Sequence, residues 1–306
     1  MKKLCVGVVG VGAIGSNHAR LYAEIPSAEF SAVYDIDQAR GNAIGRKFGA
    51  TAAKSLDDFI EAIDAASVAT PTNTHYEISR LLLSRGKHVL VEKPITDNTA
   101  HAAELADLAA SKALILQVGH VERFNPVLGA LEKHLTHPRF IEAHRLSPYP
   151  ERSTDIGVVL DLMIHDLEVI LHFVRSPVQS IDAVGVPVLS RGEDIANARL
   201  RFENRCVANV TSSRISPERV RKIRVFQEDA YLSLDYQNQS GEIYRRVGGR
   251  ITRDKVEIGR EEPLKVQLAS FVECAATGRE PRVSGFQATA ALELAVDITK
   301  RIRSSG

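Results

Sequence analysis

Glu92-Lys93-Pro94 is a short pattern with residue types suited to catalysis at an oxygen atom. It follows the apolar run His88–Val91, which is typical of a buried parallel strand that ends in a turn. Ligands of open α/β sheets bind outside the carboxyl ends of the strands, so we expect Lys93 to reach such a site. Pro94 keeps Lys93 out of the helical region. A surface lysine before a strand-ending proline is the plainer alternative.

Asp161 and His165 form a second pattern, within the mostly apolar stretch 158–170. The stretch predicts a helix, on which residues four apart share one face. Polar groups on a helix suited to burial need either partners or a function. The plainer alternative here is a helix cap and a core histidine with a satisfied hydrogen bond.

A glycine-rich turn follows the first predicted strand, Leu4–Val9. The motif is Gly10-Val11-Gly12-Ala13-Ile14-Gly15, and a helical stretch comes directly after it. In this context Gly10 permits a tight turn, Gly12 lets a pyrophosphate approach the backbone, and Gly15 lets helix and strand pack closely. The helix start, at Ala13 and Ile14, offers N–H groups and a positive dipole end to phosphates. The motif therefore predicts a dinucleotide-binding site.

Asp35 ends the second predicted strand, twenty residues after Gly15. This is the expected place for a carboxylate that binds the ribose hydroxyls. A carboxylate there repels the 2′-phosphate of NADP, so we predict NAD as the cofactor and NADP as the less favoured one. Arg40 follows at a spacing typical of a solvated helix face.

The order of predicted elements indicates two domains. Strands alternate with helices up to about residue 118, which predicts an α/β fold with a doubly wound parallel sheet. Strands then dominate from residue 180 to 247, where Ala196–Phe202 alternates in polarity as a half-covered antiparallel strand does. We expect a Rossmann domain over residues 1–119 and a second domain over residues 120–306. The basic residues of the strand-rich part are typical of an exposed sheet face, and a phosphate anchor is the sharper alternative; they are Arg214, Arg219, Arg221, Lys222 and Arg224.

The composition excludes several classes of protein. The chain has 306 residues and a formal net charge of +1, which gives no basic field for nucleic acid or membrane surfaces. No apolar run approaches the roughly 18 residues of a membrane span, and no secretory signal is apparent, so we expect a cytoplasmic protein. Its three cysteines are widely spaced, which argues against a disulfide frame or a metal site.

With these motifs in view, the chain resembles the glucose–fructose oxidoreductase / inositol dehydrogenase (Gfo/Idh/MocA) family. The resemblance covers essentially the whole chain and rests on the glycine turn, on Glu92-Lys93-Pro94, on Asp161-x-x-x-His165, and on the loop Thr70-Pro71-Thr72-Asn73-Thr74-His75. It implies a Rossmann domain followed by an α+β domain with an open, mostly antiparallel sheet. It also implies cofactor contacts from Thr70, Pro71, Asn73, His75, Glu92 and Lys93, and a cis peptide before Pro94.

The resemblance further implies that Lys93 and His165 act at a substrate hydroxyl, with Asp161 holding the substrate or the histidine. Histidine has an unperturbed pKa near 6.5, which suits a general base at neutral pH. Lys93 in its charged form would stabilise the developing alkoxide. The predicted activity is NAD-dependent oxidation of a secondary hydroxyl of a sugar, nucleotide sugar or cyclitol.

A narrower resemblance concerns Gly119–Pro126 and Asp161–Asp166, which are similar to a bacterial branch that includes UDP-N-acetylglucosamine 3-dehydrogenases. It implies a nucleotide-sugar substrate oxidised at C3. Arg123 and Asn125 would then face the sugar, and Arg145 or Arg214 would meet the diphosphate. No metal is expected.

Two other functions stay open at this point. An NAD-dependent glycosidase that oxidises its substrate transiently would use the same lysine and histidine. A non-enzymatic NAD-binding regulator is the other alternative, although such proteins tend to lose the catalytic pair. The strand-rich segment and the family resemblance both predict a homodimer or homotetramer, because one face of an open sheet needs cover.

Overall fold

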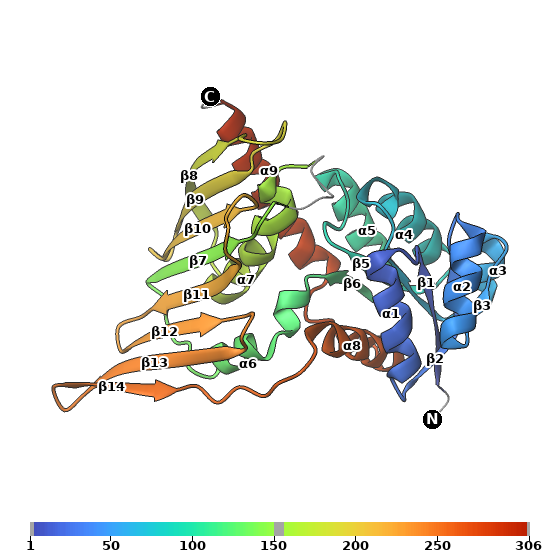
Figure 1. Ribbon diagram of the computed structural model, residues 1–306, viewed down its shortest axis with the longest axis horizontal. Coiled ribbons are helices and arrows are strands. Elements are labelled where there is room, and N and C mark those ends of the chain that lie inside the picture. The colour runs from blue at the N-terminus through green and yellow to red at the C-terminus, as the bar shows by residue number, and fades with distance from the viewer. Residues whose placement is uncertain (1–2, 150–155, 305–306) are drawn as a thin grey trace. The chain divides into compact units, whose positions relative to one another are not determined.

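The chain forms two compact units in a computed structural model that describes residues 3–149 and 156–304 (Figure 1). The first unit comprises Met1–Val121 and Glu262–Thr289. The second comprises Glu122–Glu261 and Ala290–Gly306. We expected residues 120–306 to form one domain, whereas Glu262–Thr289 pack with the first unit.

A six-stranded parallel sheet organises the first unit. Its strands are β1 (Leu4–Val9), β2 (Ala28–Tyr34), β3 (Thr51–Ala52), β4 (Ala65–Val68), β5 (His88–Glu92) and β6 (Leu116–Gly119). They lie in the order β3-β2-β1-β4-β5-β6, which is the Rossmann order. This confirms the predicted doubly wound parallel sheet. The two-residue strand β3 was not predicted, because it is too short to show any periodicity.

Helices join these strands and return the chain to the same edge of the sheet. They are α1 (Ala13–Glu24), α2 (Gln38–Phe48), α3 (Leu56–Glu61), η1 (Thr72–Thr74), α4 (His75–Ser84) and α5 (Thr99–Ser111). Side chains cap several helix starts, as at Ser55, whose hydroxyl accepts from the Asp58 N–H. Asn98 accepts from two N–H groups at the start of α5. As a result the loops after β1, β2, β4 and β5 gather at one edge.

Helix α8 (Pro263–Thr277) explains why the late segment belongs to the first unit. Leu268, Phe271, Val272 and Ala275 recur at helical spacing and join the buried cluster around β1 and α1. Burying a side chain such as Phe271 contributes about 1.5–3 kcal/mol. After the helix ends at Gly278, the Val283 carbonyl accepts from the Val118 N–H of β6.

An eight-stranded, mostly antiparallel sheet organises the second unit. Its strands are β7 (Phe140–Leu146), β8 (Val178–Val186), β9 (Ile195–Phe202), β10 (Val207–Ser213), β11 (Val220–Phe226), β12 (Ala230–Asp235), β13 (Ser240–Val247) and β14 (Arg250–Lys255). The order is β14-β13-β12-β11-β7-β10-β9-β8, with β7 and β10 parallel. The predicted fold class is thereby confirmed. Strand β14 was not predicted, because its sequence is dominated by charged residues.

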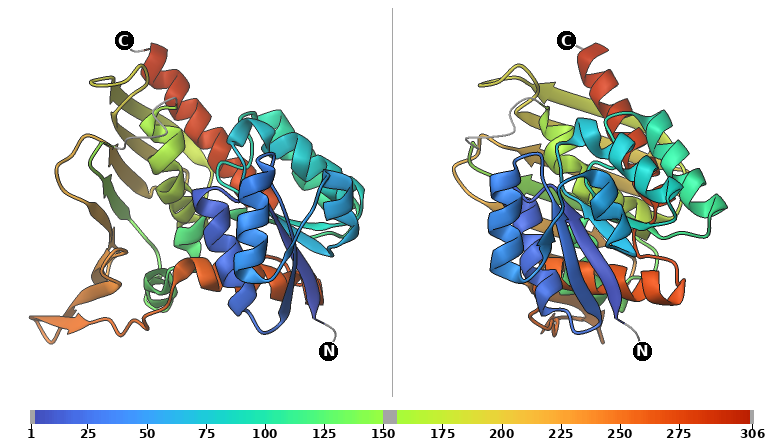
Figure 2. Two further views of the ribbon diagram at one scale, coloured as in Figure 1. Left: turned by 45° about the vertical axis from the view of Figure 1, so that its right-hand side comes forward. Right: turned by 90° about the vertical axis from the view of Figure 1, so that its right-hand side faces the viewer.

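The pleat of this sheet separates a covered face from an open one. In β9, Ala196, Ala198 and Leu200 are buried, while the alternate residues are partly or fully exposed. The helical elements are η2 (Val121–Phe124), α6 (Pro126–Glu132), η3 (Val159–Met163), α7 (Ile164–Val174) and α9 (Gly285–Ser304). Helix α7 and the carboxyl-terminal part of α9 lie on the covered face (Figure 2).

Across residues 3–149 and 156–304, no helix is long and apolar enough to cross a bilayer.

Candidate active site

The glycine turn after β1 has the shape that a dinucleotide phosphate needs. Gly10 has a φ of +81°, which glycine adopts without strain. A Cβ on Gly15 would collide with the Gly10 carbonyl oxygen, so only glycine allows α1 to approach β1 this closely. Gly12 differs, because a Cβ there would meet nothing within 4 Å. The open space over Gly12, beside the first N–H groups of α1, fits a pyrophosphate.

Asp35 lies beside this turn, directly after β2. Its carboxylate is buried and accepts hydrogen bonds from the N–H groups of Val11 and Asp37, each at 2.9 Å. Arg40 Nη1 lies 3.6 Å from Asp35 Oδ2. The structure therefore places the predicted ribose-binding carboxylate against the predicted phosphate turn.

His75 joins the loops that follow β4 and β5. It is buried, with Nε2 2.9 Å from the Thr70 carbonyl and Nδ1 3.0 Å from the Pro94 carbonyl. Burial lowers the pKa of His75, although both carbonyls act in the opposite direction. The neutral ring has one N–H, so it donates to one carbonyl at a time. The predicted residues Pro71 and Asn73 lie exposed, Pro71 directly before η1 and Asn73 within it.

Glu92-Lys93-Pro94 occupies the carboxyl end of β5, and the peptide bond before Pro94 is cis, which confirms that prediction. The Glu92 carboxylate lies over Gly119 of the neighbouring strand, where a Cβ would come within 2.5 Å of Oε1. The same carboxylate lies 3.3 Å from Nε2 of His18. Glu92 is thus fixed between β6 and α1, directly before the half-buried Lys93.

His18 was not predicted from the sequence, although it lies against the Glu92 carboxylate. It lies fully buried on α1, and among the described residues its Nδ1 has no hydrogen-bond partner. The spacing of Gly15, His18 and Tyr22 places all three on the buried face of α1, and that signal was present in the sequence. Its contact with Glu92, 74 positions later in the chain, was not.

In the second unit, Asp161 and His165 lie on a helix that differs from the predicted one. Residues Val159–Met163 form a π-helix, which continues into the α-helix from Ile164. A π-turn closes over one more residue than an α-turn, so the argument that residues four apart share a face does not hold unchanged. Such turns are frequent at functional sites. Both side chains are half-buried.

The start of this helix is held by the connection between β8 and β9. The Val158 N–H donates to the Glu193 carbonyl at 2.9 Å, and the Val159 N–H to the Glu193 carboxylate at 3.3 Å. Arg214 Nη1 donates to the Ile156 carbonyl at 2.7 Å, and its Nε donates to Asp194 at 2.8 Å. Arg214 is fully buried, so these contacts show a structural role for it.

The hydrogen bonds to Asp194 also decide its ionisation. Burial alone would raise the pKa of Asp194, but hydrogen bonds from Ser190, Leu189 and Arg214 bring it well below its usual range. Asp194 therefore stays charged opposite Arg214.

Arg145 also has internal partners. Its guanidinium donates to both carboxylate oxygens of Asp166, at 2.8 and 3.0 Å, and to Glu122 at 2.8 Å. Asp166 directly follows His165, so this buried network anchors the helix that carries the histidine. These contacts give Arg145 a structural role, and its part in diphosphate binding stays a prediction.

Arg123 and Asn125 have similar surroundings. Arg123 Nη1 donates to Glu168 at 2.7 Å, with both side chains buried. Asn125 caps α6 through the Val127 N–H and donates to the Tyr236 carbonyl at 3.1 Å. Their predicted place at the sugar likewise stays a prediction.

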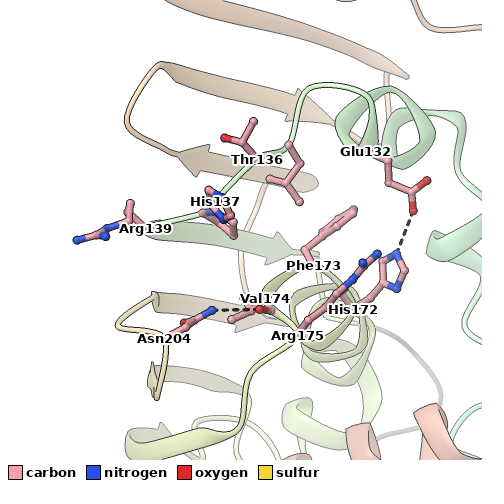
Figure 3. A pocket seen from close by; sticks show the side chains of 11 residues that line it. Glu132, Thr136, His137, Arg139, His172, Phe173, Val174, Arg175 and Asn204 are labelled. Atoms are coloured by element: carbon pink, nitrogen blue, oxygen red, sulfur yellow. Dashed lines mark hydrogen bonds and ion pairs between the residues drawn. The ribbon is translucent and has the colours of Figure 1, made fainter.

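A pocket of about 740 Å³ opens elsewhere in the second unit, at the carboxyl end of α7 (Figure 3). His172 Nε2 and the Glu132 carboxylate are hydrogen-bonded at 3.0 Å in its lining. Arg139 and Arg175 also line it. None of the predicted site residues belongs to this pocket, so it does not mark the predicted active site.

Comparison with known proteins identifies the family. Residues 4–120 match the model of an oxidoreductase family with an NAD-binding Rossmann fold, and residues 131–233 match the GFO/IDH/MocA C-terminal domain. A UDP-N-acetylglucosamine 3-dehydrogenase from Acidithiobacillus ferrooxidans is 33% identical, over 95% of each chain. A scyllo-inositol 2-dehydrogenase (NAD(+)) from Bacillus subtilis is 25% identical, over 97% of this chain and 93% of the relative.

Solved structures agree. A structure of the UDP-N-acetylglucosamine 3-dehydrogenase from Acidithiobacillus ferrooxidans matches with a TM-score of 0.95 at 32% identity, over 99% of each chain. A levoglucosan dehydrogenase in complex with NADH and levoglucosan matches with a TM-score of 0.90, over 100% of this chain and 98% of the other. Its identity is 16%, so it shows the fold alone. The chain belongs to the Gfo/Idh/MocA family of NAD-dependent oxidoreductases.

Proposed function

We propose that this oxidoreductase oxidises the C3 hydroxyl of UDP-N-acetylglucosamine and transfers the hydride to NAD. The observation that carries this proposal is the 33% identity, over 95% of both chains, to a dehydrogenase named for that reaction. The presence of Lys93, Asp161 and His165 supports it. The position of Lys93 at the carboxyl end of β5, in the unit with the glycine turn, supports it further.

The chemistry assigns one task to each group. His165 accepts the proton as the O–H bond breaks, and Lys93 stabilises the negative charge that develops on that oxygen. The C–H bond breaks with its electron pair, for which bound NAD supplies the acceptor. Asp161 orients the hydroxyl or His165.

A panel of substrates tests this proposal. NADH formation is measured with UDP-N-acetylglucosamine, UDP-glucose, glucose 6-phosphate, free N-acetylglucosamine and inositols. We expect the highest kcat/KM with UDP-N-acetylglucosamine. NADH formation from an inositol but from no UDP-sugar would instead assign the cyclitol oxidation of other relatives. Cleavage of a glycoside without net NADH formation would identify the glycosidase alternative.

We also propose that the protein assembles through the open face of the second sheet. Phe140, Phe226, Tyr231 and Tyr244 follow one another across four strands of this face, with neighbouring ring centroids 4.6–5.6 Å apart. Arg253 of β14 covers the last ring. An aromatic row of this kind on a half-exposed face favours burial against a second copy. Light scattering should report a dimer or tetramer, and a monomer at micromolar concentration would contradict this assignment.

A further inference from the structure

The basic residues on and just before β11 point to different faces of the sheet. They are Arg219, Arg221, Lys222 and Arg224. Lys222 and Arg224 lie on the open face, within 3.9 Å of Asp235 and 3.1 Å of Glu142 respectively. Arg221 alternates with them and therefore shares the covered face with Ile223, which is fully buried. One cation of the run thus points to the face that carries α7.

Arg221 stands directly opposite Arg145 in the pairing of β11 with β7. Arg145 is buried and already holds Glu122 at 2.8 Å. Arg221 Nη1 lies 3.6 Å from the same oxygen of Glu122, which is too long for a good hydrogen bond. Its side chain is 46% exposed. The guanidinium therefore keeps donor capacity toward solvent at the edge of the buried network.

The charges around Arg221 favour an additional anion. Three guanidinium groups, of Arg145, Arg219 and Arg221, act there together with two carboxylates, of Glu122 and Asp166. Partial burial lowers the pKa of Arg221 most, and repulsion by Arg145 and Arg219 adds to this, against the attraction of the carboxylates. A cation whose charged form is disfavoured in this way gains from a nearby negative group.

We propose that Arg221, assisted by Arg219, binds a phosphate or diphosphate group of the substrate, an inference that rests on the phosphate-bearing substrate proposed above. Arginine suits this role because its planar fork binds phosphate oxygens through two parallel hydrogen bonds. The site lies beside Asp166, the residue that follows His165. Arg219 and Arg221 are exposed, whereas Arg145 and Arg214 are buried.

Binding of UDP, glucose 6-phosphate and inorganic phosphate, measured by calorimetry on the NAD-loaded protein, tests the site. Arg224→Gln is the matched control for Arg221→Gln, because Arg224 lies on the same strand, is 42% exposed and also faces one carboxylate. We expect Arg221→Gln to weaken UDP binding by about ten- to a hundredfold, as the loss of a charge-assisted contact does. Arg219→Gln should weaken it less, and Arg224→Gln should leave it within about twofold.

The three probes also distinguish the source of the anion. UDP binding that is much tighter than phosphate binding assigns the site to a diphosphate, and equal affinities assign it to a single phosphate. Equal losses in Arg221→Gln and Arg224→Gln would reduce the effect to general electrostatics and overturn the proposal. Failure of the wild type to bind any of the probes at millimolar concentration would also overturn it.

NADH formation from UDP-N-acetylglucosamine separates this site from the proposed function. If Arg221→Gln oxidises UDP-N-acetylglucosamine with normal turnover and KM, the proposed function is supported and the phosphate site at Arg221 is contradicted. If UDP binding depends on Arg221 but no UDP-sugar is oxidised, the phosphate site is supported and the proposed function is contradicted.

Discussion

The two units hold their proposed site groups by different means. In the first, glycines, strand ends and backbone carbonyls fix the cofactor turn and the loops around Lys93, as the contacts of His75 with Thr70 and Pro94 show. In the second, buried ion pairs fix the helix of His165, with Arg145 between Asp166 and Glu122. Backbone geometry is local and insensitive to pH, whereas buried charges depend on distant partners and on ionisation. The second unit should therefore be more sensitive to loss of a single side chain and to pH.

The largest effect should follow removal of the two groups proposed to act at the hydroxyl, one from each unit. Lys93→Met and His165→Asn should each reduce turnover by about 10²–10⁴-fold. NAD affinity should persist in both, because the phosphate contacts are predicted at Gly10–Gly15. If the two groups serve one proton and one alkoxide, the losses in the double variant should be far from additive.

The measurements are single-turnover hydride transfer and NAD affinity. Near-normal turnover in either single variant would make that residue structural. Loss of NAD affinity in Lys93→Met would show that this residue supports the cofactor site as well as the chemistry.

The next effect compares ion pairs in the two units. Arg145→Gln leaves Glu122 and Asp166 buried without their partner, which typically costs about 3–5 kcal/mol in the free energy of unfolding. Arg20→Gln is the control, because Arg20 pairs with Glu262 at 2.6 Å in the first unit but is 37% exposed. A surface pair of this kind contributes about 0–1 kcal/mol. Denaturant unfolding of both variants measures the loss of unfolding free energy in each. Equal losses would contradict the claim that the second unit depends more strongly on single charged side chains.

A third effect concerns pH. Burial raises the pKa of Glu168 to about 7, although Arg123 acts in the opposite direction. In the unfolded chain a glutamate has a pKa of about 4.3, so between these values the folded state binds more protons. The free energy of unfolding should then fall by about 2 kcal/mol from about pH 5 to about pH 7 and level off above the folded pKa.

Glu168→Gln removes the contribution of Glu168 to the pH dependence of the unfolding free energy, since glutamine does not titrate. The difference in unfolding free energy between wild type and variant should change over that pH window. Glu203→Gln, at an exposed carboxylate of the same unit, should run parallel to the wild type. A Glu168→Gln curve that is also parallel would show that Glu168 is charged in the folded protein throughout.

The contrast between local backbone geometry and distant charged partners also explains which features could be predicted from the sequence. Alternating polarity predicted the strand at Ala196–Phe202, which is part of β9, and the glycine turn and Asp35 were found because their spacing is local. The π-turn at Asp161 was missed because it leaves no periodic signal in five residues. The internal partners of Arg145 and Arg214 were not predicted, because a charge in the sequence does not reveal its partner. Those partners, Asp166 and Asp194, lie 21 and 20 positions away and meet them only through the fold.

The smallest predicted effect is cofactor preference in the first unit. Asp35 is held by the N–H groups of Val11 and Asp37, so it cannot swing away from a 2′-phosphate without losing two hydrogen bonds. NAD should therefore bind at least about tenfold better than NADP, or about 1.4 kcal/mol. Asp35→Asn should narrow this gap, because it removes the repulsion and leaves Arg40 next to the added phosphate. Asp37→Asn is the control, since Asp37 also pairs with Arg40 but lies exposed at the start of α2. Calorimetric titration of both cofactors decides the matter, and equal affinities in the wild type would mean that Arg40 offsets the carboxylate.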